Sequence, residues 1–328
     1  MSVTIKDIAI KAGVSYSTVS KALNNSPLVK QGTKDKITRI ANELGYQPNY
    51  AAQRLVNKKT NMIGLIWPTI ERSVPAQLVM LIREALEQKG FSMILSVDPI
   101  ETALEMFKRF QIDGLIIFEG SDRYDLSQIN IPLVAYGINR PHKHYPLVDA
   151  NHRAAIGKAI DHFVRLGHRH IQFVGQLDSK DPFQLEKQNG FTQALAEHNF
   201  KYTQNNVIGT TGLDWFDGYQ AIQKCIESHR LGSALISASY ELSQGIVRYL
   251  AEHSIQVPDQ VSIISYDNIM QMSHIEIPLS AVGVTLPELT HVIVSKLLQQ
   301  FGEQPLQTML TKLTPELVIR QSSLKSVQ

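Results

Sequence analysis

Short apolar runs alternate with helix-like stretches along the chain from residue 62 onward. Strands that alternate with helices at this spacing form βαβ units, which pair into parallel sheets. Because open sheets seldom exceed about ten strands, we expect two doubly wound sheets with a ligand cleft at the carboxyl ends of their strands. The predicted strands are Met62–Trp67, Ser92–Val97, Gly114–Phe118, Pro132–Tyr136, His170–Gly175, Ser233–Ala238 and Val261–Tyr266. The predicted helices lie at about Ala76–Lys89, Thr102–Phe110, Arg153–Leu166, Lys187–His198, Asp217–Ser228, Leu242–His253 and Leu289–Phe301.

The composition indicates the cellular compartment of the protein. Hydrophobic residues make up 43% and charged residues 19% of the 328, which is typical of a globular protein. Cys225 is the one cysteine, so the chain cannot form an internal disulfide, and this fits a reducing compartment. The sequence has neither a signal-peptide run nor an apolar stretch of membrane-spanning length. We therefore expect a soluble, cytoplasmic protein.

Charge is divided unevenly along the chain. Residues 1–60 hold ten Lys or Arg against three Asp or Glu, a net charge of +7, whereas the remainder carries −5. A basic end on an acidic body confines nucleic-acid affinity to that end. Small domains also vary in charge by chance, so this pattern alone leaves both interpretations open.

The first 47 residues contain three helical patterns. Thr4 starts the first, and Gly13 allows the tight turn that ends it. Ser15 caps the second, which runs from Tyr16 to about Leu23, and the third covers about Thr33–Leu44. Two short helices joined by a glycine turn and backed by a third are typical of a helix-turn-helix head, although other small bundles share this pattern.

The outward face of the second helix indicates what the head binds. Tyr16, Ser17, Ser20 and Lys21 are short or flat polar side chains with one cation. Such groups can enter a major groove and contact base edges or phosphates, whereas a merely solvated face is more often rich in Glu and Lys. The face therefore favours base reading.

Residues 4–24 and 44–55 closely resemble the head of the LacI/GalR family of repressors. The resemblance implies that Tyr16, Ser17 and Lys21 read bases in the major groove. Lys21 stands where an arginine is common, and a lysine lacks the bidentate fork that recognises guanine. The implied contacts to backbone phosphates are Thr4, Ser15, Thr18, Asn24, Tyr46 and Asn49.

A short basic segment, residues 48–60, follows the head. Pro48 and Asn49 break the third helix, and a further helix of Tyr50 to about Val56 is too short to be stable alone. A charged linker is one interpretation. The resemblance implies instead a hinge helix that orders on DNA, with Ala52 and Leu55 in the minor groove and Leu55 as a wedge between bases. Leu55 could equally contact the hinge of a second subunit.

Residues 61–328 resemble the periplasmic-binding-protein-like body of the same family. Matching segments include Met-Ile-Gly-Leu-Ile-Trp-Pro at 62–68 and Val-Pro-Asp-Gln-Val-Ser-Ile-Ile-Ser-Tyr-Asp-Asn at 257–268. The expected fold is thus an all-α helix-turn-helix head plus an α/β body of two doubly wound parallel-sheet lobes. The chain would cross between lobes three times. Lobe 1 would hold about 61–157 and 287–306, and lobe 2 about 158–286 and 307–328.

The sequence carries no signature of catalysis or of a cofactor. It lacks GxGxxG and P-loop strings after a strand, and it lacks HExxH and GxSxG. Its eleven histidines are scattered, and the His168–His170 cluster lacks the convergent ligands that a metal needs. We expect no enzyme, no cofactor and no metal. A solute-binding protein of the periplasmic type shares the body, but it would not need residues 1–60.

Asp267 matches the family's cleft carboxylate and is the best single candidate for contacting an effector. An aspartate at such a turn also commonly caps a helix. Trp67, Thr69 and Ser73 follow the first strand and are expected to line the same cleft. Trp215 either stacks on a sugar or is a surface aromatic residue.

Several expected cleft positions depart from the family pattern. Lys187 stands where an arginine usually clamps the ligand, and Tyr240 and Asn151 replace acids. Val284 replaces a glutamine. These changes alter the hydrogen-bonding groups of the pocket, so the effector cannot be carried over from the family.

Together these features predict a transcription regulator, most simply a repressor of carbohydrate-related genes. Its partners would be double-stranded operator DNA, a second copy of the chain in a homodimer, and a sugar-like effector in the cleft. The operator would be pseudo-palindromic, because the two-fold symmetry of a dimer is mirrored in its site. The sequence leaves open activation against repression, and dimer against tetramer.

Overall fold

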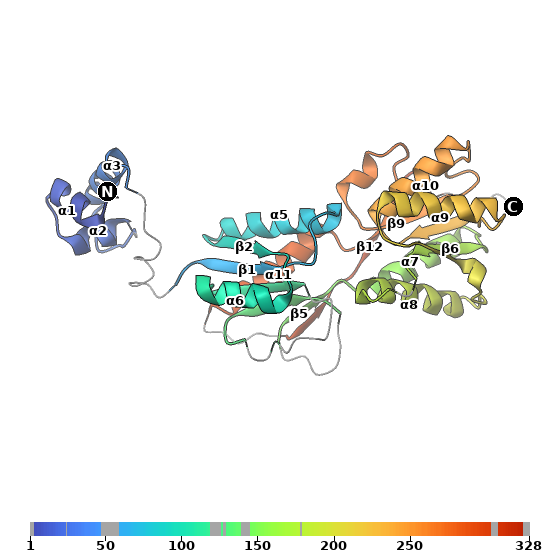
Figure 1. The fold of residues 1–328 in the computed structure, drawn as a ribbon, viewed down its shortest axis with the longest axis horizontal. Helices are drawn as coiled ribbons and strands as arrows, with labels where there is room; N and C mark the ends of the chain where they lie inside the picture. Colours follow the sequence, from blue (N-terminus) through green and yellow to red (C-terminus); the bar gives the residue numbers. More distant parts are fainter. Residues whose placement is uncertain are drawn as a thin grey trace. The chain divides into compact units, whose positions relative to one another are not determined.

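The computed structural model describes residues 3–23, 25–46, 59–118, 126, 129–138, 145–177, 179–302 and 308–323 (Figure 1). Its contacts divide the chain into two compact units, residues 1–60 and 61–328. We describe each unit by itself.

Three helices form the described part of the head: α1 (Ile5–Ala12), α2 (Tyr16–Leu23) and α3 (Gln31–Glu43). Each contacts the other two. Their apolar faces meet at Ile8, Val19 and Ile37, whose side chains are fully buried. Each such burial contributes about 1.5–3 kcal/mol, which makes this small core the source of the head's stability.

The head's turns follow the predicted local chemistry. The Asp7 carboxylate accepts hydrogen bonds from the backbone N–H of Thr4 (2.8 Å) and from its hydroxyl (2.7 Å), and these bonds lower the pKa of Asp7. Gly13 ends α1 with a φ of +68°, a conformation that favours glycine. At the start of α2, the Ser15 hydroxyl accepts from the backbone N–H of Thr18 (3.2 Å). The expected helix-turn-helix arrangement is confirmed, with α3 starting two residues before Thr33.

The first lobe of the body is built on a six-stranded parallel sheet in the order β11-β5-β4-β3-β1-β2. Helices α5 and α11 pack on one face of this sheet and α6 on the other. The strands are β1 (Met62–Ile66), β2 (Ser92–Ser96), β3 (Gly114–Phe118), β4 (Leu133–Tyr136), β5 (Leu147–Asp149) and β11 (Leu310–Lys312). The helices are α5 (Ser73–Glu87), α6 (Ile100–Phe110) and α11 (Leu286–Gln299).

The second lobe has a six-stranded sheet in the order β12-β10-β9-β8-β6-β7. In Figure 1, helices α9 and α10 cover one face and α7 and α8 the other, in agreement with the two apolar clusters beneath them. The strands are β6 (Ile171–Gly175), β7 (Val207–Gly209), β8 (Ala234–Ser237), β9 (Ser262–Tyr266), β10 (Ser280–Gly283) and β12 (Glu316–Val318). The helices are α7 (His152–Arg165), α8 (Pro182–Glu197), α9 (Trp215–Glu227), α10 (Tyr240–Glu252) and the short η2 (Gln204–Asn206) and η3 (Met270–Ser273).

The expected pair of parallel-sheet lobes is confirmed, with one exception in pairing. Strand β12 runs antiparallel to β10, whereas every other neighbouring pair in this sheet is parallel. The chain does cross between the sheets three times, after β5, after β10 and after β11.

Two of the expected crossing points need correction. Helix α7 packs on α8 and β10, so the first crossing lies at residues 150–151 rather than at 157. Strand β11 pairs with β5 of the first sheet, so residues 310–312 belong to lobe 1 although 307–328 was expected in lobe 2. Both errors arise because a crossing leaves no local pattern in the sequence, only a change of pairing partner.

Candidate functional site

The predicted base readers lie on the exposed face of α2. Tyr16 is 50% exposed, and Ser17 and Lys21 are also exposed. On the opposite face of the same helix, Val19 and Ala22 are buried in the head's core. The core packing therefore fixes which side chains α2 presents to a partner.

A cluster of hydroxyl groups lies at the N-terminal end of α2. Ser15 Oγ is 3.0 Å from Ser17 Oγ and 2.8 Å from Thr18 Oγ1. Thr4 is exposed, and Tyr46 packs partly buried against the head's core. Of the other predicted DNA contacts, Asn24, Asn49, Ala52 and Leu55 fall outside the described residues.

Several of the head's cations hold the head together. Lys11 pairs with Glu43 (3.3 Å), and Lys36 Nζ donates to the carbonyl of Ala12 at the end of α1 (2.9 Å). Lys21, in contrast, projects from the reading face and is exposed.

The body has a cavity of about 90 Å³ between its two lobes. Six aromatic rings dominate its wall. Those from the first lobe are Trp67, Phe118 and Tyr136, and those from the second are His152, Phe183 and Tyr266. The Phe118 and Phe183 rings meet across the lobes with their centroids 4.7 Å apart. The chain's own rings thus fill much of the cleft that parallel-sheet folds keep for a ligand.

Lys187 lies at the wall of this cavity, and its side chain is buried. Its Nζ donates to the carbonyl of Ala238 (2.8 Å) and lies 3.7 Å from the centroid of the Tyr266 ring. Burial lowers the pKa of Lys187 to about 8, against a smaller opposing effect of the Asp267 carboxylate. A buried ammonium beside an aromatic ring is a strong point of attraction for an anion or an acceptor group.

Asp267 lies at the cavity and also binds the first residue of a helix. Its Oδ2 accepts from the backbone N–H of Tyr240, the first residue of α10 (3.1 Å), and the residue also lines the cavity. Burial raises the pKa of Asp267, and the charges of Lys187 and Arg72 partly offset this. The carboxylate therefore ties the start of α10 to the cleft.

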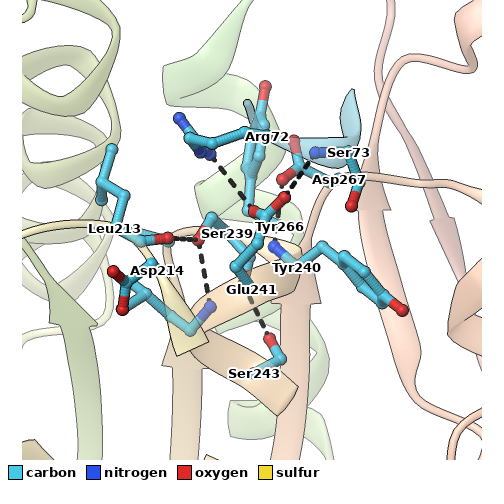
Figure 2. A network of polar contacts seen from close by, with 12 residues as sticks. Arg72, Ser73, Leu213, Asp214, Ser239, Tyr240, Glu241, Ser243, Tyr266 and Asp267 are labelled. Atoms are coloured by element: carbon cyan, nitrogen blue, oxygen red, sulfur yellow. Dashed lines mark hydrogen bonds and ion pairs between the residues drawn. The ribbon is translucent and has the colours of Figure 1, made fainter. Parts of the chain in front are cut away.

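An ion pair and a hydrogen bond join the two lobes beside Asp267 (Figure 2). Glu241, at the start of α10 in lobe 2, accepts from the backbone N–H of Ser73 in lobe 1 (2.8 Å). Its second oxygen lies 3.5 Å from a guanidinium nitrogen of Arg72. Arg72 and Ser73 stand at the N-terminus of α5, where the helix dipole also favours the carboxylate. We call this group, Arg72, Ser73 and Glu241, the interlobe latch.

The structure gathers some predicted effector residues and separates others. Trp67, Lys187 and Asp267 line the cavity, as does Val284. Tyr240 and Ser73 contribute backbone N–H groups to the neighbouring network.

Three other residues predicted to contact an effector do not line this cavity. Asn151 lies at the lobe crossing and lines a separate groove on α7 and α8. Thr69 accepts from the backbone N–H of Glu71 instead of lining the cavity. Trp215 is 52% exposed at the start of α9, where it packs on Phe216 and Tyr219.

His152, Gln184 and Glu241 were not predicted as cleft or latch residues. His152 and Glu241 bind partners far along the chain, as Glu241 does with Ser73, 168 residues away. The one available local signal was a polar residue in the first turn of a helix that follows a strand.

The described part of the chain offers neither a metal site nor a membrane-spanning helix. No three His, Cys, Asp or Glu side chains there converge on a point that could hold a metal ion. Within those same ranges, the helices are too short or too polar to cross a membrane.

Comparison with known proteins agrees with both units. The model of the bacterial lacI regulatory family matches residues 4–49, and the periplasmic binding protein-like domain matches residues 160–323. The probable HTH-type transcriptional repressor ExuR of Bacillus subtilis is 27% identical over 311 residues, covering 92% of each chain. Catabolite control protein A of Priestia megaterium is 26% identical and covers 98% of this chain and 100% of its own length.

Solved structures share the fold. The lac repressor dimer bound to operator and the anti-inducer ONPF superposes with a TM-score of 0.86 at 24% identity, covering 99% of this chain and 100% of that one. The curated relatives are transcription regulators, which confirms the expectation that the chain is not an enzyme. The chain belongs to the LacI family of bacterial regulatory proteins and is a DNA-binding transcription regulator with a periplasmic-binding-protein-like body.

Proposed function

We propose that this protein is a cytoplasmic repressor that binds a pseudo-palindromic operator as a homodimer and is controlled by a small molecule in the interlobe cleft. The exposed polar face of α2 on a basic head carries the DNA-binding part of the proposal. Tyr16, Ser17 and Lys21 are the proposed base readers. The hydroxyls of Thr4, Ser15 and Thr18 and the phenol of Tyr46 are the proposed phosphate contacts.

Genome-wide mapping of DNA bound by the full-length protein tests this proposal. It predicts enrichment of sites with two related half-sites in inverted orientation. Transcripts next to those sites should rise when the gene is deleted, because a repressor lowers their expression. Sites without two-fold symmetry, or transcripts that fall on deletion, would contradict the dimeric repressor.

Lys21→Ala should weaken operator binding about tenfold or more and reduce its salt dependence, because a cation at the DNA surface is lost. Fluorescence anisotropy on the mapped operator, at several salt concentrations, measures both effects. Lys11→Ala is the matched control, since Lys11 is neutralised by Glu43 within the head. Equal losses in the two variants would remove the reading role of Lys21.

The effector is proposed to be a sugar or a sugar derivative. Related solved structures support this class, since one LacI family regulator from Enterococcus faecium holds ribose and the regulator CelR holds cellobiose. Binding between the lobes would favour one spacing of the lobes and thereby change how two heads reach DNA. A solute-binding protein would use the same body, but it would leave the residue 4–49 head unexplained.

A further inference from the structure

Buried polar atoms without a hydrogen-bond partner line the interlobe cavity. They are Trp67 Nε1, His152 Nε2 and Gln184 Oε1, each on a side chain that is more than nine-tenths buried. Arg72 Nε, at the same cavity, is also without a partner. Buried polar atoms nearly always have a partner, so this group points to a ligand that supplies the missing ones.

The hydrogens on these atoms define what the ligand must offer. Burial and the nearby Lys187 charge lower the pKa of His152 well below its usual range, so the ring is neutral and carries one N–H. Tyr266 Oη lies within hydrogen-bond distance of Nδ1, and we assign the phenol as the donor, which leaves the ring hydrogen on Nε2. The unpartnered atoms on these cavity-lining side chains are therefore three donors, on Trp67, Arg72 and His152, and one acceptor, Gln184 Oε1.

Two cations, Arg72 and Lys187, lie at the cavity. Lys187 holds its ammonium over the Tyr266 ring, within the cleft. Each of the two acids of the wall has one oxygen bonded to a backbone N–H, because Asp181 Oδ1 accepts from Phe183 and Asp267 Oδ2 from Tyr240. Glu241 is held by the interlobe latch.

We propose that the cleft binds a small hydroxycarboxylate, whose carboxylate accepts from the unpartnered donors and whose hydroxyl donates to Gln184. A carboxylate is an acceptor-only group, which fits an excess of donors better than the hydroxyls of a neutral sugar. This inference rests on the proposed function and names the chemical class of its effector.

The size and position of the cavity agree with such a ligand. Its volume of about 90 Å³ is smaller than the roughly 150 Å³ of a cavity that holds benzene, so the ligand must be small. Trp67 belongs to lobe 1 whereas His152 and Gln184 belong to lobe 2, so one ligand would join both lobes. Ligand binding would thereby stabilise the closed arrangement.

Calorimetry and thermal-shift measurements on the full-length protein test the class with matched compounds. L-lactate carries both groups, lactamide lacks the charge, and propionate lacks the hydroxyl. Sodium gluconate and glucose repeat the comparison on a longer carbon chain. The inference predicts that lactate or gluconate binds at least about tenfold more tightly than its neutral counterpart, and that propionate binds more weakly than lactate.

Two variants locate the binding. Trp67→Phe keeps the ring and removes the N–H, and it should weaken acid binding about tenfold. Trp215→Phe is the matched control and should bind normally, because Trp215 lies outside the cavity. It also leaves Trp67 as the sole tryptophan, so its fluorescence reports occupancy directly. Gln184→Met should abolish the preference for lactate over propionate, which is a readout that simple destabilisation would not mimic.

The outcomes separate this inference from the proposed function. Equal or tighter binding of the neutral compound in both pairs, lactamide against lactate and glucose against gluconate, overturns the inference and leaves a small-molecule regulator intact. Unchanged acid binding in both Trp67→Phe and Gln184→Met also overturns it. Binding of none of the compounds overturns it as well, and operator binding by the same preparation then shows whether the DNA-binding function stands.

Discussion

At the scale of single residues, Lys187 is a buried cation in a wall of rings. Burial lowers its pKa to about 8, below the 10.5 of an exposed lysine. The charged and titratable groups that face it are Arg72, His152, Asp181, Glu241, Tyr266 and Asp267. The three acids raise the pKa of Lys187 and Arg72 lowers it. Burial is the largest effect, so the pKa is lowered overall.

This position predicts a stability that rises with pH. Between pH 8 and 9.5 the unfolded chain keeps the Lys187 proton while the folded body releases it, and stability increases wherever the unfolded state binds more protons. The gain should approach about 2 kcal/mol over this window. Urea unfolding of the body at several pH values measures it, and Lys187→Met should flatten the curve. An equal rise in Lys187→Met would assign the effect to another group.

The sequence and the structure agree on cleft residues that lie directly beside strand ends. Trp67 follows β1 and Asp267 follows β9, so the pattern of strands places them at the sheet edges. His152 and Gln184 were missed because their role depends on which elements face them from the other lobe. Hydrophobic periodicity contains no information on that pairing.

At the scale of elements, α9 and α10 approach each other closely through two glycines. A Cβ on Gly245 would contact the backbone of Trp215 and Tyr219, and a Cβ on Gly218 would contact the backbone of Leu242. Neither glycine has a φ that requires glycine, so close packing alone explains both. The two helices are thus held together by backbone contact.

Gly245→Ala should therefore destabilise the body by about 1–3 kcal/mol, because the added methyl forces the two backbones apart. Gly157→Ala is the matched control on α7, where nothing lies within 4 Å of the added atom. It should stabilise the protein by about 0.5–1 kcal/mol through helix propensity. Chemical denaturation of both variants gives the comparison. A neutral Gly245→Ala would show that the crossing tolerates a wider separation.

The type of each helix and strand was predicted more accurately than the residues at which it begins and ends. Every predicted strand and helix of the body has a counterpart, but several helices begin earlier than expected. Helix α8 begins at Pro182 rather than Lys187, because Asp181 caps it and proline fits a first turn. The strands β5, β7, β11 and β12 were missed because each has only three residues, too few for a period to appear, and the four-residue β10 was missed as well.

At the scale of the whole body, three chain crossings, contacts between aromatic rings and the interlobe latch join the two lobes. The crossings are linked to one another, since the backbone N–H of Leu313 donates to the carbonyl of Asp149 (2.8 Å). The side chain of Lys158 binds the carbonyl of Pro315 (2.7 Å). These bonds hold the pivot, whereas the interlobe latch lies at the cleft and can break without disturbing either sheet.

Glu241→Ala should shift the body toward an open arrangement. It removes the acceptor for Ser73 and the partner of Arg72, which together are worth about 1–3 kcal/mol in a buried setting. If the closed form is the one that binds ligand, a smaller closed population lowers the apparent affinity in proportion, by about tenfold. Small-angle scattering should show a larger radius of gyration without ligand and recovery of the wild-type value at saturation.

The control for this change lies on the same helix. Glu252 ends α10 and pairs with Arg248 and Tyr219, all within lobe 2. Glu252→Ala should therefore lower stability slightly while leaving scattering and ligand affinity unchanged. If both variants expand the protein equally, α10 itself is loosened and the latch does not set the lobe spacing. If only Glu241→Ala expands the protein, the closed arrangement of the lobes is stabilised by a few bonds beside the cleft. A ligand bound in the cleft could then strengthen or replace those bonds.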